Sequence, residues 1–474
     1  MEPATSASTA SISATRLVVM VGTPEVDRPA YQWLSEAVRS LVADGRLLHG
    51  TRLPSERSMV AALGLSRTTV TRAYAELRDR GYATARQGSG TIAVLPGGPA
   101  AGGAEPVPMG VPGSAPAGAI DWRSAAPPAV AGLTSAYARA GEHIGRFVSG
   151  MGYFPVGIPE IREAVAQRYT ERGLATSPDQ IIVTTGATEG TAAAAQVLLG
   201  RGSRVIAETP AYPNSLVTLR REVSRVVPVP ITWDGSDVGA WESATVGSGA
   251  RAAFLTPDFH NPTGALLDAE RRDQLAALWR RHKLTGLVDE TLAELVIDDL
   301  TMPAPMAAFA TSAVTVGSVS KMLWGGLRVA WIRAPRNLIG PLTQARMSIG
   351  LGGPVMEQMV AADLIRRGVG SDNERRDSLR SRRRVVMDGI HEALPDWTTV
   401  APPGGLWLWW RLPVPRSTAL VRAAREEGLL MLPGSTFAVA ESGLEHWVRT
   451  PFALPEADLT EAVVRLARAW ARVT

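Results

Sequence analysis

Residues 96–119 constrain the fold of this chain more than any other stretch, because almost all of them are proline, glycine, alanine or another small residue. Such a stretch has too little apolar surface to pack and too many breakers to form a helix or strand. It therefore predicts a linker that is extended where its prolines cluster. The linker separates residues 1–95 from residues 120–474, and 474 residues are enough for two or three domains.

Composition excludes several classes of protein. The chain has no cysteine, so it holds no disulfide, thiolate metal site or thiol nucleophile. Its apolar runs are too short to cross a bilayer, and its Ser-, Thr- and Ala-rich start lacks the pattern of a secretion signal. We expect residues 1–27 to be a disordered arm. We expect the protein to be soluble, cytoplasmic and without a bound metal.

The N-terminal part has the pattern of a winged helix-turn-helix. Between residues 34 and 42 the apolar positions recur at helical spacing. Further helices are predicted at about 55–63 and 66–80, separated by a glycine, and two short strand-like pieces follow around "RQGSG". Two helices joined by a tight turn and followed by a hairpin predict this fold for residues 28–95.

The first turn of the third predicted helix would face DNA, because a recognition helix presents its N-terminal turn to base edges in the major groove. Arg67 can grip guanine with two hydrogen bonds, and the hydroxyls of Ser66, Thr68 and Thr69 suit phosphates. Gly88 leaves the hairpin tip thin enough to approach a minor groove. The alternative is a small helical domain whose arginines merely face solvent.

Residues 28–94 closely resemble the DNA-binding domain of the GntR family of bacterial transcription factors. The similarity runs through "GTRLPSERSMVAALGLSRTTVTRAYAELRDRGY" and "GSGT". The resemblance implies DNA contacts from one set of residues, namely Arg57, Arg67, Thr68, Thr69, Thr71 and Gly88. Phosphate contacts from Arg52 and Arg72 are a further expectation.

The C-terminal part alternates between β-rich runs and helical segments. The runs "QIIVTT", "SRVIAET", "RAAFLTP", "TGLVDE" and "AVTVGS" end in small or polar residues, and segments such as "EGTAAAAQVLL" lie between several of them. This alternation predicts an α/β domain with a mostly parallel sheet and helices on both faces. In such sheets ligands bind beyond the carboxyl ends of the strands.

Lys321 is a candidate functional residue because the chain has only two lysines, Lys283 and Lys321, among 49 lysines and arginines. Lysine has a nitrogen that can lose its proton and form a Schiff base, whereas the guanidinium of arginine stays protonated. In "VGSVSKMLWGGLR" the lysine lies near groups that suit a phosphate: the hydroxyls of Ser318 and Ser320 and the guanidinium of Arg328.

Further residues suit the other parts of one cofactor. Backbone N–H groups at the start of the helix in "TTGATEG" could hold the same phosphate; they belong to Gly186, Ala187 and Thr188. Asp289 could pair with a protonated ring nitrogen, Asn261 with a ring hydroxyl, and Tyr212 could stack on the ring. Each feature alone could be structural. Together with Lys321 they predict a site for pyridoxal 5′-phosphate.

The order of these features resembles that of the fold-type I aminotransferases over residues 120–474, where "GYFPVGIPEIREAVAQRYTERG" and "PPGGLWLWWRL" are also similar. The resemblance implies a smaller C-terminal subdomain and a homodimer with the site at the subunit interface. It also implies that Tyr153 reaches the partner's cofactor phosphate and that Arg449 binds the α-carboxylate of an amino acid.

One position departs from the aminotransferase pattern. The family usually has a tyrosine, bonded to the ring oxygen of the cofactor, two or three residues after the aspartate; this chain has Thr291 and Leu292. Thr291 is a candidate substitute, although its hydroxyl reaches less far and is less acidic than a phenol. The departure therefore puts efficient transamination in doubt.

The whole arrangement, a GntR-type domain linked to an aminotransferase-like body, resembles the MocR subfamily of vitamin B6-dependent bacterial regulators. The resemblance implies a transcriptional regulator in which Lys321 captures pyridoxal phosphate as effector or sensor, with an amino acid or amine as candidate co-effector. Three alternatives stay open. They are a working aminotransferase with an appended DNA-binding domain, a dimerisation body that has lost the cofactor, and a sensor of pyridoxal phosphate itself that controls vitamin B6 synthesis.

Overall fold

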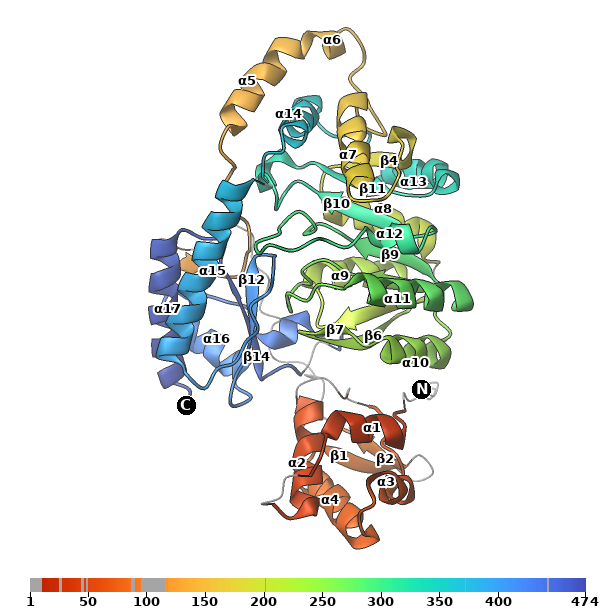
Figure 1. Ribbon diagram of the computed structural model, residues 1–474, viewed down its shortest axis with the longest axis vertical. Helices are drawn as coiled ribbons and strands as arrows, with labels where there is room; N and C mark the ends of the chain where they lie inside the picture. Colours follow the sequence, from red (N-terminus) through yellow and green to blue (C-terminus); the bar gives the residue numbers. More distant parts are fainter. Residues whose placement is uncertain are drawn as a thin grey trace, which may run out of the picture.

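The computed structural model describes residues 11–24, 28–43, 47, 50–86, 90–94, 116, 118–200, 202–370, 372–440 and 443–474. A small N-terminal domain and a much larger C-terminal body are distinct in Figure 1. Gly88 and the predicted linker, except for residues 116, 118 and 119, lie outside the described residues. Within the described ranges no helix is long and apolar enough to cross a membrane.

The N-terminal domain is the predicted winged helix-turn-helix. It contains helices α2 (Ala30–Ala43), α3 (Glu56–Leu63) and α4 (Arg67–Asp79) and the antiparallel pair β1 (Ala83–Arg86) and β2 (Gly90–Ala93). Local signals set the turn between α3 and α4. Gly64 ends α3 in the left-handed conformation at φ 67°, and Ser66 caps α4 by accepting a hydrogen bond from the N–H of Thr69 at 3.1 Å.

A helix lies where we expect a disordered arm. Helix α1 spans Ala14–Val21 and begins at the capping residue Ser13. Its Leu17 is fully buried in the apolar core of the domain, together with Trp33 and Met59. The prediction of disorder is therefore wrong for residues 14–21, because packing against the domain stabilises a short helix that composition alone does not favour. Residues 1–10 and 25–27 lie outside the described residues.

The C-terminal body contains the predicted mostly parallel sheet. Its eight strands have the order β4-β11-β10-β9-β8-β5-β6-β7, and β11 and β7 run antiparallel to their neighbours. The strands are β4 (Ile181–Thr184), β5 (Arg204–Thr209), β6 (Arg225–Thr232), β7 (Gly235–Ser236), β8 (Ala252–Leu255), β9 (Thr285–Asp289), β10 (Val314–Ser318) and β11 (Ala330–Arg333).

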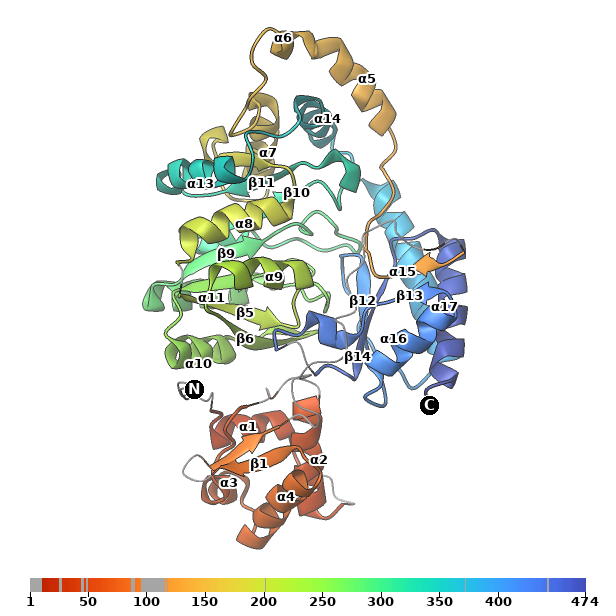
Figure 2. The same ribbon diagram turned by 180° about the vertical axis from the view of Figure 1, so that it is seen from behind.

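Both faces of this sheet are buried under helices (Figure 2). Alternate residues of β5 show the arrangement, since Val205 and Ala207 belong to the core beneath α8 and α9 while Ile206 belongs to the core beneath α10 and α11. The helices around the sheet are α7 (Pro159–Glu171), α8 (Ala187–Leu198), α9 (Pro213–Glu222), α10 (Val238–Ser248), α11 (Ala269–His282), α12 (Met306–Phe309), α13 (Arg336–Ile349) and α14 (Val355–Arg366).

A smaller C-terminal subdomain packs beside the sheet, as the aminotransferase resemblance implies. Its antiparallel strands β12 (Trp407–Arg411) and β14 (Trp447–Pro451) are covered by α15 (Asn373–Ala393), α16 (Ser417–Glu426) and α17 (Glu456–Ala471). The chain enters this subdomain first through β3 (Ile120–Asp121), which pairs in parallel with β13 (Leu429–Leu430).

After β3 the chain crosses to the far end of the body, where α5 (Leu133–His143) packs against α14 and α6 (Gly145–Val148) follows. Figure 1 shows α5 and α6 projecting from the upper end of the molecule. The end of α6 and the segment after it are strongly exposed, with Val148 at 70%, Met151 at 90% and Tyr153 at 63% of full exposure.

Candidate functional site

Two of the groups predicted to bind the phosphate, the backbone at the start of α8 and the guanidinium of Arg328, lie next to each other. Gly186 directly precedes α8, and a Cβ atom at this position would collide with the guanidinium of Arg328. The side chain of Arg328 therefore lies against the backbone that opens the helix, beside Ala187 and Thr188. Arg328 follows the 3₁₀ helix η2 (Gly325–Leu327) and has a left-handed backbone at φ 53°. A helix start beside a guanidinium is an anion site with both a dipole and a full charge.

Ser318 and Ser320 differ in their roles at this end of β10. The Ser318 hydroxyl is buried and lies 3.0 Å from the hydroxyl oxygen of Ser320 and 3.3 Å from the carbonyl oxygen of Val329. It also accepts from the N–H of Ser320 at 3.1 Å. Ser318 thus holds the turn that leads to Lys321, whereas the hydroxyl proton of Ser320 can be offered to a ligand.

Lys321 follows this turn with its amine directed into the body. Its Nζ donates to the carbonyl oxygen of Ala125 at 2.7 Å. Burial, and next the positive charge of Arg449, lower the pKa of Lys321 to about 8. A much larger share of this amine is therefore neutral near pH 7 than of an exposed lysine, and neutrality is the condition for nucleophilic attack.

Asp289 ends β9 and lies almost fully buried, at 9% exposure. Its Oδ1 accepts from the N–H of Thr291 at 3.0 Å and from the Thr291 hydroxyl at 2.7 Å. Burial raises the pKa of Asp289, the two bonds from Thr291 oppose the rise, and Asp258 adds to it. Thr291 therefore fixes the carboxylate, and its hydroxyl proton is directed to Asp289 rather than to a ring oxygen. Leu292 is buried in the core.

Asn261 and Arg449 are hydrogen-bonded to each other, and Arg449 is close enough to Lys321 for its charge to act on the amine. Arg449, on β14, is 5% exposed and lies between the rings of Phe437, at 4.8 Å, and Trp407, at 5.5 Å. Its Nη1 donates to Oδ1 of Asn261 at 3.0 Å, so the Asn261 NH₂ group is the one that can face a ligand. Burial lowers the pKa of Arg449 to about 10, yet the group stays charged at pH 7.

Tyr212 and Tyr153, both predicted to contact the cofactor, differ in exposure. Tyr212 immediately precedes α9, is half-buried, and accepts a hydrogen bond from Nδ2 of Asn214 at 3.0 Å. Burial raises its pKa, and Arg449 opposes the rise. Because the charge of Arg449 acts on the pKa of Tyr212, the two side chains lie near each other. Tyr153 is exposed and belongs to the segment that follows α6.

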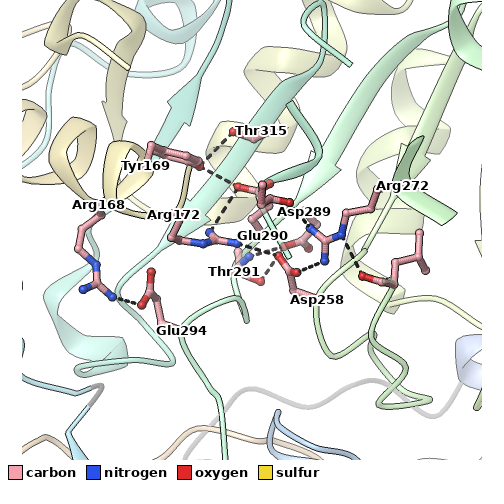
Figure 3. A network of polar contacts seen from close by, with 12 residues as sticks. Arg168, Tyr169, Arg172, Asp258, Arg272, Asp289, Glu290, Thr291, Glu294 and Thr315 are labelled. Atoms are coloured by element: carbon pink, nitrogen blue, oxygen red, sulfur yellow. Dashed lines mark hydrogen bonds and ion pairs between the residues drawn. The ribbon is translucent and has the colours of Figure 1, made fainter. Parts of the chain in front are cut away.

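A buried polar network around Asp289 was not predicted from the sequence (Figure 3). Arg272 and Asp258 form an ion pair at 2.6 Å with both side chains fully buried. Glu290, next to Asp289 in sequence, accepts from the hydroxyl of Tyr169 at 3.0 Å. Burial raises the pKa of Glu290, and the charge of Arg172 opposes the rise. The consecutive carboxylates in "VDE" at a buried strand end were the sequence signal for this network.

Two backbone carbonyls also belong to the site, and no side-chain motif in the sequence predicted them. The carbonyl oxygen of Ala125 accepts from Lys321, and that of Arg123 accepts from Nη2 of Arg449. These donors and acceptors are 196 and 326 residues apart in sequence. The segment just after β3 therefore lies across the two cations on which the predicted chemistry depends.

Most of the described residues that are predicted to face DNA lie on the surface, and some of them also make contacts within the domain. Arg57, Arg67 and Thr68 are exposed on α3 and α4. The Thr69 hydroxyl lies 2.7 Å from that of the capping residue Ser66, and the hydroxyl of Thr71 donates to Glu56 at 2.5 Å.

The two arginines expected to contact phosphate also differ. Arg52 is exposed. Arg72 is held over the ring of Tyr31 at 3.8 Å. All four of these arginines, Arg52, Arg57, Arg67 and Arg72, are exposed, and together they form a basic surface.

Known families match both parts of the chain. Residues 120–466 match the family "Aminotransferase class I and II", and residues 30–92 match "Bacterial regulatory proteins, gntR family". The first range contains each residue of the candidate ligand site described above, and the second contains α2, α3, α4 and all of the β1–β2 hairpin except its last residue, Ala93. The boundary between the two matches falls on the stretch predicted as a linker.

Relatives with both parts are regulators by name. The HTH-type transcriptional regulator TauR of Rhodobacter capsulatus is 28% identical over 473 residues, covering 92% of this chain and 95% of TauR. The probable rhizopine catabolism regulatory protein MocR of Rhizobium meliloti is 28% identical over 403 residues, covering 79% of this chain and 80% of that protein.

The body alone is similar to solved aminotransferases. The α-aminoadipate aminotransferase LysN of Thermus thermophilus, complexed with N-(5′-phosphopyridoxyl)-L-leucine, is 27% identical with a TM-score of 0.68. The similarity covers 75% of this chain and 93% of LysN. The ligand in that structure joins a pyridoxyl phosphate to an amino acid, which are the two chemical groups that the residues around Lys321 and Arg449 suit.

Proposed function

This chain belongs to the class I and II aminotransferase family, fused to a GntR-family DNA-binding domain in the manner of the MocR regulators, and we propose that it is a transcriptional regulator that senses pyridoxal 5′-phosphate through Lys321. An amino acid or amine bound with the cofactor is the proposed co-effector. One observation carries the proposal: side chains suited to each part of the cofactor gather near the partly buried Lys321 in a chain that also has a DNA-binding domain.

The described residues fit pyridoxal phosphate. The start of α8 and the guanidinium of Arg328 suit the phosphate, and Asp289 suits the ring nitrogen because its raised pKa and fixed orientation favour sharing a proton with that nitrogen. The NH₂ group of Asn261 suits the ring oxygen. When bound, the cofactor supplies an aldehyde for a covalent bond to an amine and a ring that withdraws electrons. Lys321 presents the amine in partly neutral form.

Arg449 supports an amino acid as the co-effector. Its guanidinium is buried, and its hydrogen bonds to Asn261 and Arg123 end on neutral oxygens. A carboxylate placed there would add an opposite charge to a desolvated cation and accept two parallel hydrogen bonds. The flanking rings of Phe437 and Trp407 fix the plane of the guanidinium, which favours a planar two-oxygen ligand over a single anion.

The exposed end of α6 and the segment after it support a homodimer. Val148, Met151 and Tyr153 are too exposed and too apolar to be explained by contacts within one chain. Burial in a second copy, with Tyr153 reaching the partner's phosphate site, would account for them. Two DNA readers in one dimer require an operator with two half-sites, direct or inverted. A footprint that covers a single half-site at full affinity would contradict this arrangement.

Operator binding tests the proposed function. Operator DNA is first selected from a random library with the purified full chain, and its affinity is then measured with and without pyridoxal phosphate. We expect the cofactor to change the affinity by about tenfold or more, a typical size for coupling between two sites. Lys321→Ala should keep the affinity measured without cofactor and lose the response. Cofactor binding seen by absorbance with an unchanged operator affinity would overturn the sensing role.

A working aminotransferase is the second candidate, favoured by the candidate cofactor residues near Lys321 and by the lowered pKa of its amine. The absence of the family tyrosine near Thr291 argues against efficient turnover, because the Thr291 hydroxyl is directed to Asp289. Incubation with amino donors and a keto acid separates the two functions. Multiple turnovers per site would favour the enzyme, whereas amino acids that alter operator affinity without turnover would favour the regulator.

A further inference from the structure

Residues 120–125, here called the strap, follow the predicted linker and lead from it to the ligand site. The strap begins at β3, where the N–H of Ile120 donates to the carbonyl oxygen of Gly428 at 2.9 Å and the N–H of Trp122 donates to that of Leu430 at 2.8 Å. Arg465 holds the same point, since its Nη1 donates to the carbonyl oxygens of Gly118 and Gly428 at 3.0 and 3.1 Å. The predicted linker enters the body here.

The strap then runs across the two functional cations. The carbonyl oxygen of Arg123 accepts from Arg449, and the carbonyl oxygen of Ala125 accepts from Nζ of Lys321 at 2.7 Å. A side-chain clamp fixes the strap between these contacts and β3. Oδ1 of Asp121 accepts from the N–H of Arg123 at 3.0 Å, and Oδ2 pairs with Nη2 of Arg123 at 2.8 Å.

Ligands of the proposed function would compete with the strap for both donors. When a neutral lysine amine condenses with an aldehyde, a carbon–nitrogen double bond forms, and both amine hydrogens leave with the aldehyde oxygen as water. Lys321 then loses the hydrogens it offers to Ala125. A carboxylate is a stronger acceptor for Arg449 than the neutral carbonyl of Arg123. Each hydrogen bond from a charged group changes an equilibrium by about tenfold or more.

We propose that the strap is the element that transmits ligand occupancy to the DNA-binding half: it loosens when Lys321 and Arg449 engage their ligands. The inference rests on the proposed function and adds the segment through which ligand binding affects the DNA-binding domain. The strap's own hydrogen bonds to these cations are lost, while the β3 pairing and the buried side chains of Trp122 and Ala125 still hold it in the body. The strap therefore loosens locally, at the point where the linker enters the body, without leaving it.

Hydrogen exchange of the full chain tests the strap directly. Peptides covering residues 119–128 are followed by mass spectrometry without ligand, with pyridoxal phosphate, and with pyridoxal phosphate plus an amino acid that alters operator affinity. We expect exchange in this region to become about tenfold faster with both ligands. Unchanged exchange while the absorbance shows bound cofactor would overturn the strap and leave the proposed function intact. A chain that binds no cofactor would overturn both.

Asp121→Ala provides the functional test, because it removes the clamp without touching Lys321 or Arg449. We expect this variant to show fast exchange of the strap without ligand, to keep its cofactor absorbance, and to lose the operator response. Glu163→Ala is the matched control, since it breaks an exposed ion pair between Glu163 on α7 and Arg366 on α14, and it should respond like the natural chain. An Asp121→Ala variant that keeps the full operator response would overturn the proposal.

Discussion

The pH dependence of cofactor capture is a direct test of the burial of Lys321. Burial, followed by the charge of Arg449, lowers the pKa of this amine from 10.5 to about 8. Only the neutral amine attacks an aldehyde, so the neutral fraction sets the rate of capture. At pH 7 this fraction is about 9% for a pKa of about 8 and about 0.03% for an ordinary lysine, a ratio of about 300.

Because the pKa is lowered, the neutral form is already dominant above about pH 8. The rate of capture should therefore rise about tenfold per pH unit between pH 6 and 7 and level off above about pH 8. Stopped-flow absorbance after mixing the protein with pyridoxal phosphate measures this rate. The cofactor itself also ionises over this pH range. To remove that effect, the rate for the protein is divided at each pH by the rate at which the neutral form of a small primary amine reacts with pyridoxal phosphate.

Two variants separate the causes. Lys321→Arg keeps the positive charge but has no nitrogen that can lose its proton, so capture should disappear. Arg449→Gln removes the neighbouring charge, and the pH at which the rate levels off should move upward. A rate in the natural protein that continues to rise beyond pH 10 would show that Lys321 is solvated and would refute the argument.

Three further predictions concern other parts of the molecule. Arg67→Ala should weaken operator binding in a mobility-shift assay by about 1–3 kcal/mol and leave the cofactor absorbance unaltered; a changed spectrum would contradict the division into two domains. Leu17→Ala should destabilise the N-terminal domain by about 2–5 kcal/mol in thermal unfolding, and natural stability would mean that α1 contributes nothing. Gly186→Ala should lower cofactor affinity by about tenfold or more in an absorbance titration, because its Cβ displaces Arg328; undiminished affinity would remove Arg328 from the phosphate site.

The winged helix-turn-helix could be predicted from the sequence because its signals are local. Ser55 and Ser66 cap α3 and α4, and Gly64 provides the left-handed residue between them. Capping and positive φ depend on residues a few positions apart, so the sequence shows them directly. Helix α1 was missed for the opposite reason. Its stability comes from burying Leu17 against residues such as Trp33 and Met59, which lie well beyond its own turn.

The candidate residues of the ligand site could be named from the sequence, because they follow strand ends in an order typical of one family. The hydrogen-bond partners of these side chains were not predictable. The sequence does not show that the Thr291 hydroxyl donates to Asp289, or that Asn261 directs its oxygen to Arg449. Such choices depend on which of several neighbouring acceptors is closest once the chain is folded.

The sequence by itself determined the two-part organisation, the fold of each part and the chemistry of the cofactor site, since these follow from local propensity, from strand and helix periodicity, and from residue types that have no substitute. Only the tertiary structure decided that carbonyls of Arg123 and Ala125 hold Arg449 and Lys321. Every non-proline residue carries the same backbone carbonyl, so its partner depends on where the fold places it, and no pattern of side chains can reveal it.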